Sequence, residues 1–252
     1  MRPKSLHRFF VETAQISEGQ VRFSRRQTHQ IARVLRMRLG DALAVFDGTG
    51  AEHEAELIAF DAENATALLK GIRAATPEAA LRLILLQGLP KAEKMELIVQ
   101  KATELGIHRV VPLLCARSVP KGSSRLPRWR IIAREAAEQS GRAVVPTIDD
   151  PVSFTAFFAA EGGPGLRGIV LWEDEVERGL REALRLMTHA GRLHVLVGPE
   201  GGLSPDEVAL AGDHGLVTAS LGQRTLRTET ATLVALSIIQ YELGDLGLPR
   251  AS

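Results

Sequence analysis

Two glycine-containing turns in the C-terminal third of the chain hold the residues that could do chemistry. The first reads Leu196-Val197-Gly198-Pro199-Glu200-Gly201-Gly202, and the second, about twenty residues later, spans 221–231 and reads LGQRTLRTETA. Each begins as an apolar stretch, breaks at glycine and leads into a helical pattern. In α/β proteins, strand-to-helix junctions of this kind expose backbone N–H and C=O groups to a small ligand at the carboxyl ends of the strands. We therefore predict a ligand pocket formed by the two turns.

The residue types in the first turn limit the kind of ligand. The turn is not the G-x-G-x-x-G of dinucleotide sites, and it lacks the Gly-Lys-Ser/Thr of a phosphate-binding loop. Glu200 disfavours a phosphate, because two negative charges repel each other at short range. The same carboxylate suits a positively charged ligand, or one with hydroxyl and amine donors. A nucleotide-dependent enzyme is therefore the least favoured class.

Arg227 and Glu229 are the residues of the second turn that could act on a ligand. A guanidinium stabilises a developing anion, and a carboxylate can orient that guanidinium. The same residues also have a structural interpretation, in which Thr228 caps the last helix and Arg227 pairs with Glu229. The sequence by itself leaves both interpretations open.

An alternation of strands and helices after Pro77 positions these turns. Continuous apolar strands that alternate with helices are typical of a parallel sheet covered on both faces. Ser204-Pro205-Asp206-Glu207 matches a capping box and predicts a helix start. The last helix is apolar on almost every side, which predicts burial in its own domain or in a subunit interface. We expect strands at 81–86, 109–114, 168–172, 193–197 and 217–221, and helices at 93–105, 127–140, 179–189, from 205 onward and at 229–243.

The pattern before residue 77 indicates a small β-barrel-like domain with one helix. Strands are expected at 42–46, 52–60 and 65–72, and a linker at 74–78. Residues 24–38 are predicted to form a helix with Ile31, Val34 and Leu35 on its apolar face. At about 100° per residue, four basic residues fall opposite that face. They could meet phosphates or simply face solvent, and they are Arg26, His29, Arg33 and Arg36.

The composition is that of a globular protein, with 45% hydrophobic and 24% charged residues. No apolar run reaches the ~18 residues of a membrane span, and residues 1–10 lack the apolar core of a signal peptide. The single cysteine, Cys115, allows no internal disulfide, so a cytoplasmic location is expected. The seven histidines show no metal-ligand spacing, and we predict no metal site.

The net charge is +1, but the charged residues are unevenly distributed along the chain. Residues 1–40 carry nine Lys/Arg and two acids, a net of +7, and residues 115–145 carry seven bases and two acids, a net of +5. Residues 41–75 carry two bases and seven acids, a net of −5. Local basic clusters in a nearly neutral protein indicate either a polyanion-binding surface or ordinary solvated faces.

The two turns together resemble the signature of the SPOUT class of S-adenosylmethionine-dependent RNA methyltransferases. The chain is most similar to the RsmE family, which methylates N3 of one uridine in 16S ribosomal RNA. The likeness extends over nearly the whole chain in separated motifs that stand in register. They are His7-Arg8-Phe9-Phe10, His29, Val34-Leu35-Arg36, Pro90-Lys91, Lys101-Ala102-Thr103-Glu104-Leu105-Gly106, Arg117-Ser118, Arg128-Trp129, Glu135-Ala136-Ala137-Glu138-Gln139-Ser140, Arg142, Val145-Pro146, 198–202 and 226–231.

The resemblance implies two domains. Residues 1–73 would form a PUA-like RNA-binding domain, a small β-barrel. Residues 78–252 would form a SPOUT methyltransferase domain, an α/β domain whose parallel sheet carries a trefoil knot, with the knot and the cofactor site at about 193–245. It also implies a homodimer through the knotted domain, with 16S rRNA or the small ribosomal subunit as partner.

The resemblance also implies the site residues, with S-adenosylmethionine as the cofactor. The expected catalytic residues are Arg227, Glu229 and Arg8. The cofactor would be held by Leu196, Val197, Gly198, Pro199, Glu200, Gly201, Gly202, Leu221, Gly222, Leu226 and Thr230. RNA would be bound by Arg8, Arg26, His29, Arg33, Arg36, Arg117, Arg128 and Arg142.

Methylation at N3 sets its own chemical requirements. The imide N3 must lose its proton before it attacks the sulfonium methyl, and a paired uridine must first be splayed out. Arg227, with help from Arg8 or Arg142, would stabilise the charge that develops on the uracil carbonyl oxygens. The expected general base is Glu229, with His7 or His29 as weaker candidates.

Two positions depart from the family pattern, and two other functions stay open. Thr225 stands where an aliphatic residue is usual, and Ala116 stands where a glutamate is usual. The first alternative is another SPOUT methyltransferase with a different target nucleotide in rRNA or tRNA. The second is a non-catalytic RNA-binding assembly factor that retains the cofactor turns.

Overall fold

The chain folds into two compact units. The computed structural model describes residues 6–61, 63–75, 77–118, 125–163, 166–187 and 191–249. Residues 1–77 and 137–145 form the first unit, and residues 78–136 and 146–252 form the second. The segment 137–145, which sequence reasoning places in the second domain, therefore belongs by its contacts to the first unit.

The first unit is built on a six-stranded sheet. Its strand order is β1-β4-β5-β6-β3-β2, with β1 parallel to β4 and the other pairs antiparallel. Alternate side chains of these strands, together with Ile31 and Met37, close a core that includes Phe9, Val21 and Leu43. The strands are β1 (His7–Phe10), β2 (Ile16–Ser17), β3 (Gln20–Phe23), β4 (Ala42–Phe46), β5 (Glu52–Phe60) and β6 (Ala65–Arg73), with a short helix η1 (Thr13–Gln15) before β2.

The predicted helix at 24–38 is shorter and less regular than expected. A five-residue α1 (Arg25–His29) passes into a π-helical turn, η2 (Gln30–Val34). In that turn the Leu35 N–H donates to the Gln30 carbonyl at 2.9 Å. The wider turn rotates the following side chains, so Val34 is 64% exposed while Met37 is only 6% exposed. Placing Val34 on the buried face was therefore wrong, because the prediction assumed 3.6 residues per turn throughout.

The second unit is an α/β layer structure with a seven-stranded parallel sheet. The strand order is β10-β8-β7-β12-β11-β13, and β9 pairs with β8. The prediction of a parallel sheet is confirmed. The strands are β7 (Arg82–Gly88), β8 (Arg109–Leu114), β9 (Thr147–Ile148), β10 (Val152–Ser153), β11 (Gly168–Leu171), β12 (Arg192–Val197) and β13 (Leu216–Ala219).

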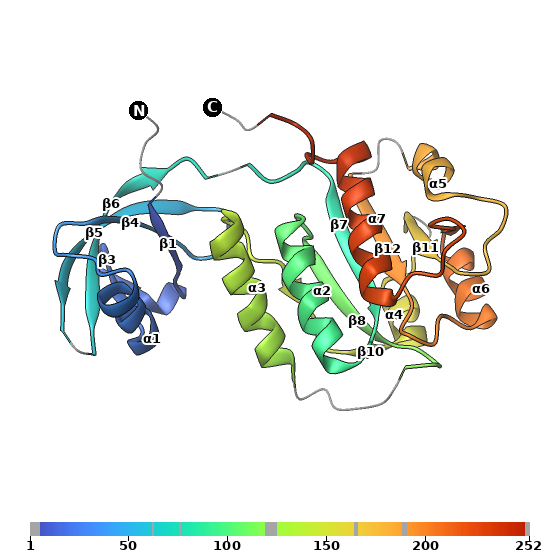
Figure 1. Cartoon of the computed structure of the whole chain (residues 1–252), viewed down its shortest axis with the longest axis horizontal. Helices are drawn as coiled ribbons and strands as arrows, with labels where there is room; N and C mark the ends of the chain where they lie inside the picture. The colour runs from blue at the N-terminus through green and yellow to red at the C-terminus, as the bar shows by residue number, and fades with distance from the viewer. Residues whose placement is uncertain are drawn as a thin grey trace. The chain divides into compact units, whose positions relative to one another are not determined.

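Helices cover both faces of this sheet. Ile84 and Leu86 of β7 pack in one cluster with residues of α4 (Phe154–Glu161) and α6 (Pro205–Asp213). Alternate strand residues face opposite sides, so the buried Leu83 and Leu85 face the other layer. Figure 1 shows α2 (Ala92–Glu104) and α7 (Thr228–Leu243) lying across the sheet side by side. The remaining helices are α3 (Leu126–Ser140) and α5 (Leu180–Leu186).

Most helix boundaries were predicted correctly from local sequence signals. The capping box before α6 is confirmed: the Glu207 N–H donates to Ser204 Oγ at 3.2 Å, and the Ser204 N–H donates to Glu207 Oε2 at 2.9 Å. Helix α5 ends at Leu186 rather than at 189, and residues 188 and 189 lie outside the described part of the chain. Helix α7 is buried on one face only, because Ile238 is 37% and Tyr241 67% exposed.

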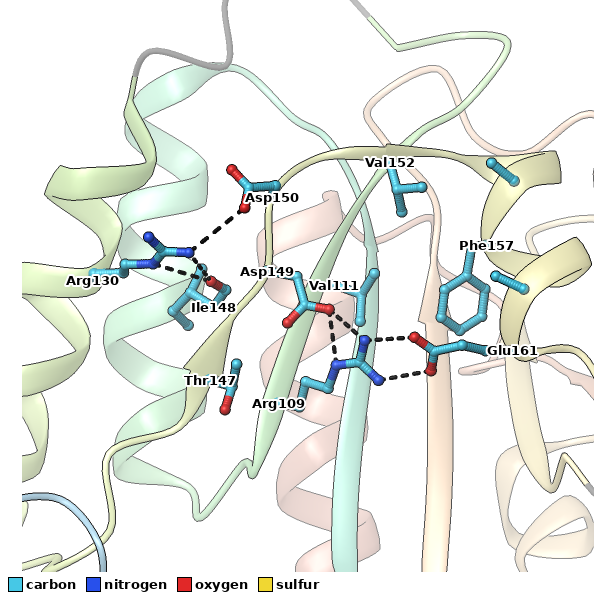
Figure 2. A pocket seen from close by; sticks show the side chains of 12 residues that line it. Arg109, Val111, Arg130, Thr147, Ile148, Asp149, Asp150, Val152, Phe157 and Glu161 are labelled. Atoms are coloured by element: carbon cyan, nitrogen blue, oxygen red, sulfur yellow. Dashed lines mark hydrogen bonds and ion pairs between the residues drawn. The ribbon is translucent and has the colours of Figure 1, made fainter.

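An ionic cluster ties the β8 end of the sheet to α4 (Figure 2). Arg109 donates to Asp149 Oδ2 at 2.5 and 2.8 Å and to both carboxylate oxygens of Glu161 at 2.6 and 2.7 Å. A cavity of about 380 Å³ lies beside it, with Val111 and Phe157 in its wall. Hydrogen bonds from Arg109 outweigh burial and lower the pKa of Glu161.

This cluster predicts an acid-sensitive contribution to stability. The folded-state pKa of Glu161 is below its unfolded value of ~4.3, so its stabilisation is present above that pH and is lost as the pH falls through the folded pKa. Glu161 is 39% exposed in its side chain, so solvent screens the pair. We expect Glu161→Gln to cost roughly 0.5–1 kcal/mol at pH 7 and progressively less as the pH falls below ~4. Urea unfolding across this range measures it, with Glu242→Gln on α7 as control. A deficit that persists undiminished at pH 3 would contradict the ionic origin.

Candidate active site

A cavity of about 760 Å³ opens where β11, β12 and β13 end. Its size lies within the ~300–1,000 Å³ typical of cofactor and small-molecule sites. Three loops build its walls: the first glycine turn after β12, the second after β13, and a loop at 172–179 after β11. Of the expected cofactor-binding residues, Leu196, Gly201 and Thr230 do not line it. Those that do are Val197, Gly198, Pro199, Glu200, Gly202, Leu221, Gly222 and Leu226.

A buried polar network fixes the first turn to the start of α7. The Thr228 hydroxyl donates to the Gly198 carbonyl at 2.6 Å and accepts from Gln87 Nε2 at 3.1 Å. The Thr232 hydroxyl donates to Gln87 Oε1 at 2.7 Å. Such satisfied buried groups rigidify the backbone around them. Thr228 was a candidate for the N-cap, but Arg227 holds that position and Thr228 is the first helical residue.

Glycine is required in both turns for different reasons. In the first turn, a Cβ built on Gly202 would overlap Glu173 Oε1, and the φ of Gly202 is +71°. In the second turn, Gly222 has φ +108° and open space around it, so only the backbone conformation demands glycine there. Its N–H donates to Ser220 Oγ at 3.2 Å.

The third wall, at 172–179, was missed by sequence reasoning. Glu175 holds it in place, because Oε1 accepts the Glu177 and Arg178 N–H groups at 2.7 and 3.0 Å and Oε2 accepts the Thr218 hydroxyl. The hydrogen bond from Thr218, followed by those from the backbone, lowers the pKa of Glu175. No local pattern marks this loop. Only the sheet order, which puts β11 between β12 and β13, brings it to the cavity.

Charged residues from three elements meet at the rim of the cavity. Lys94 of α2, missed from the sequence, lies 3.4 Å from Glu200 Oε1 and 3.1 Å from Glu229 Oε2. The Lys91 N–H also donates to Glu200 at 3.1 Å. Burial raises the pKa of Glu200, but backbone hydrogen bonds and Lys94 outweigh it, so the pKa is lowered. Glu229 does not line the cavity, whereas Lys94 does.

Arg227 is the N-cap residue of α7, at the edge of the cavity. It is exposed, lines the cavity and makes no side-chain capping bond. Within the described residues its guanidinium has no hydrogen-bond or ion-pair partner. Thus Arg227 is available to an anionic group in the cavity.

Comparisons with known proteins find matches over nearly the whole chain. Residues 77–240 match the family described as RNA methyltransferase domain, and residues 23–70 match the RNA methyltransferase PUA domain. Ribosomal RNA small subunit methyltransferase E of Bacillus subtilis is 35% identical, covering 94% of this chain and 97% of that protein. The chain belongs to the ribosomal RNA small subunit methyltransferase E family. The Synechocystis protein of the same name is also 35% identical, over 92% of this chain and 77% of its own length.

Solved structures give the same result for the fold. Ribosomal RNA small subunit methyltransferase E from Neisseria gonorrhoeae, bound to S-adenosyl methionine, has a TM-score of 0.85 at 29% identity and covers 96% of this chain and 100% of its own. A Legionella pneumophila protein in complex with the cofactor SAM has a TM-score of 0.81 at 29% identity, with the same coverage. The predicted fold class, an α/β parallel-sheet domain after a PUA domain, is confirmed.

The basic residues that this family resemblance marks for RNA binding lie in different settings. Arg26, His29, Arg33 and Arg36 are exposed along α1 and η2 and just after them. Arg117 donates to the Gly201 carbonyl at 3.0 Å, and Arg128 lies 3.6 Å from Glu96. Arg142 is buried, with 7% exposure.

The guanidinium of Arg8 forms hydrogen bonds within the first unit of this family member. Its Nε and Nη2 donate to Glu52 Oε2 at 3.0 and 2.6 Å. Nη1 donates to the carbonyls of Ala137 and Glu138 at 3.2 and 3.1 Å, and Nη2 to that of Arg142 at 3.0 Å. These five bonds match the five N–H donors of a guanidinium. Arg8 therefore has no donor left for RNA in this conformation.

Neither a metal-ligand cluster nor a membrane-spanning helix is found in the described part of the chain. In these ranges no group of three or more His, Cys, Asp or Glu side chains could hold a metal ion. None of the helices there has both the length and the hydropathy of a bilayer-spanning segment.

Proposed function

We propose that this protein transfers the methyl group of S-adenosylmethionine to N3 of a uridine in 16S ribosomal RNA. The observation that carries the proposal is the cavity framed by the two glycine turns, with an uncommitted arginine at its edge. The relatives named as ribosomal RNA small subunit methyltransferases E, and the Neisseria structure bound to S-adenosyl methionine, support it.

The residues of the cavity fit this cofactor. Gly198, Gly202 and Gly222 bring the backbone itself to the cavity wall without side chains of their own, and Leu221 and Leu226 add apolar surface. The carboxylates of the wall suit a cationic ligand better than a phosphate. We propose that the two turns hold the cofactor, which supplies an electrophilic methyl group when bound.

The chain's own residues would do the rest of the chemistry. Arg227 would stabilise the negative charge that grows on the uracil carbonyl oxygens as N3 loses its proton. Glu229, two residues later at the start of α7, is the proposed proton acceptor. Because Glu229 is ion-paired with Lys94 and does not line the cavity, the pair must open for it to act.

Two substitutions, Glu229→Gln and Lys94→Met, distinguish a role of Glu229 as the general base from a role as the ion-pair partner of Lys94. We expect Glu229→Gln to lower kcat by about 100-fold at neutral pH with little change in cofactor affinity, because general-base assistance is worth roughly 10²–10⁴. Lys94→Met removes the ion pair but keeps the carboxylate, so most activity should remain. A tritiated-methyl assay across pH 6–9 measures both. Equal losses in the two variants would show that the pair, and not the base, is what matters.

RNA and a second subunit complete the proposal. The exposed basic residues of α1 and η2, within the stretch that matches the PUA domain, would bind RNA phosphates. A homodimer through the knotted second domain would cover Ile238 and Tyr241, the exposed apolar residues of α7. The knot and a cytoplasmic location remain part of this proposal, and sedimentation equilibrium tests the dimer.

Nucleoside mapping tests the reaction itself. Small-subunit RNA from a strain that lacks the gene, treated with the purified protein and S-adenosylmethionine, should gain 3-methyluridine at one position by mass spectrometry. A different methylated nucleoside would favour another SPOUT activity. Cofactor binding without any transfer, on either free RNA or assembled subunits, would favour a non-catalytic assembly factor.

A further inference from the structure

Three carboxylates line the cofactor cavity, and two of them are occupied in holding its walls. Glu175 accepts two backbone N–H groups and the Thr218 hydroxyl. Glu200 accepts the Lys91 N–H at 3.1 Å and lies 3.4 Å from the Lys94 ammonium. Their negative charges are therefore largely compensated by the protein.

Glu173, the third carboxylate, is not compensated in this way. Across the described residues it has no hydrogen-bond or ion-pair partner. Its Oε1 occupies the space where a Cβ on Gly202 would stand, so the carboxylate lies against the backbone of the first glycine turn. An uncompensated negative charge thus stands between two walls of the cavity.

Basic residues also line the cavity, and they come from three elements. Lys94 is committed to Glu200 and Glu229, and Arg178 follows Glu175 on the third loop. Arg224 and Arg227 both come from the second turn. Glu173 comes from the loop after β11, whereas these two arginines come from the loop after β13. This arrangement favours a cation beside Glu173 and an anion beside the second turn.

A methyl donor of the sulfonium class changes its charge in the reaction. As the N3–CH₃ bond forms and the S–CH₃ bond breaks, the sulfur keeps the bonding electron pair and becomes a neutral thioether, while the N3 proton goes to the base. The α-amino and carboxylate groups are the same before and after transfer. A wall carboxylate near the sulfur would therefore distinguish donor from product by a single positive charge.

We propose that Glu173 is a specificity-determining residue that favours the charged sulfonium donor over its neutral demethylated product. This inference rests on the proposed function. It gives Glu173 a role beyond binding, because a product that is held less tightly than the donor leaves the site more readily.

Binding measurements without turnover test this directly. Isothermal titration calorimetry would compare S-adenosylmethionine, S-adenosylhomocysteine and sinefungin, in which an amine supplies the positive charge. We expect Glu173→Gln to weaken S-adenosylmethionine and sinefungin by roughly three- to ten-fold, as expected for one partly screened charge pair. Its affinity for S-adenosylhomocysteine should stay the same. Glu173→Asp, which keeps the charge, should retain most of the preference.

Asp174→Asn is the matched control, because it removes the same charge from the neighbouring exposed residue, which does not line the cavity. It should leave all three affinities unchanged. If Glu173→Gln weakens all three ligands equally, or none, the inference is overturned while the proposed function stands. If the unmodified protein binds none of the three, the proposed function fails and the inference fails with it.

Discussion

Arg227→Ala is expected to lower the rate of methyl transfer by about 10²–10³-fold, which corresponds to the loss of one preorganised donor at a developing anion. The affinity for S-adenosylmethionine should change by less than about two-fold. Two observations support this separation. Arg227 lines the cavity without an internal partner, and its side chain makes no capping bond that α7 would lose. Its backbone, with φ −65° and ψ 151°, is equally accessible to alanine.

Two further variants sharpen this test. Arg227→Lys keeps the charge but loses the planar fork, so it should recover only part of the rate. Arg224→Ala removes a guanidinium from the same turn and is expected to cost far less, because it does not adjoin the helix start. Single-turnover methyl transfer and calorimetric cofactor titration supply the two readouts. Equal loss of binding and transfer in Arg227→Ala would assign this arginine to the cofactor instead.

Arg8→Met is expected to destabilise the first unit by about 3–5 kcal/mol, the usual cost of leaving a buried charge without its partner. The side chains of Arg8 and Glu52 are 14% and 4% exposed, and Arg73, 3.6 Å from Glu52, is the other cation that the described residues place beside it. The carbonyls of Ala137, Glu138 and Arg142 also lose their donor. We therefore propose that Arg8 joins the end of α3 to the first sheet rather than binding RNA.

Hydrogen exchange measures this effect locally, because protection should fall in β4, β5 and the last turn of α3. The double variant Arg8→Met/Glu52→Gln should recover part of the loss, since it leaves no unpaired buried charge. The Arg227→Ala protein, which should keep its full stability, is a convenient reference. Unchanged protection together with weaker RNA binding would return Arg8 to the RNA interface.

Elements set by local signals were predictable from the sequence. The bounds of β4, β5 and β8 were predicted as the structure has them. The strands β4 and β8 are mainly apolar runs, and β5 lies between two polar turn sequences, at 47–50 and 61–64. The helix start at Ser204 followed from four consecutive residues. By contrast, the short strands β1 and β3 were not predicted, since they form by pairing with β4 and β6 and four residues carry too little pattern of their own.

The sequence by itself determined the two glycine turns, the parallel α/β class and the family, because these depend on residues adjacent in the chain or on motifs in register. The tertiary structure alone decided which groups surround the turns. Strand order brought the loop with Glu173 and Glu175 to the cavity, and helix packing brought Lys94 between Glu200 and Glu229. It also gave Arg8 its partners, which lie 44 to 134 residues away in sequence. Contacts over such separations arise from the packing of whole elements, which no local pattern records.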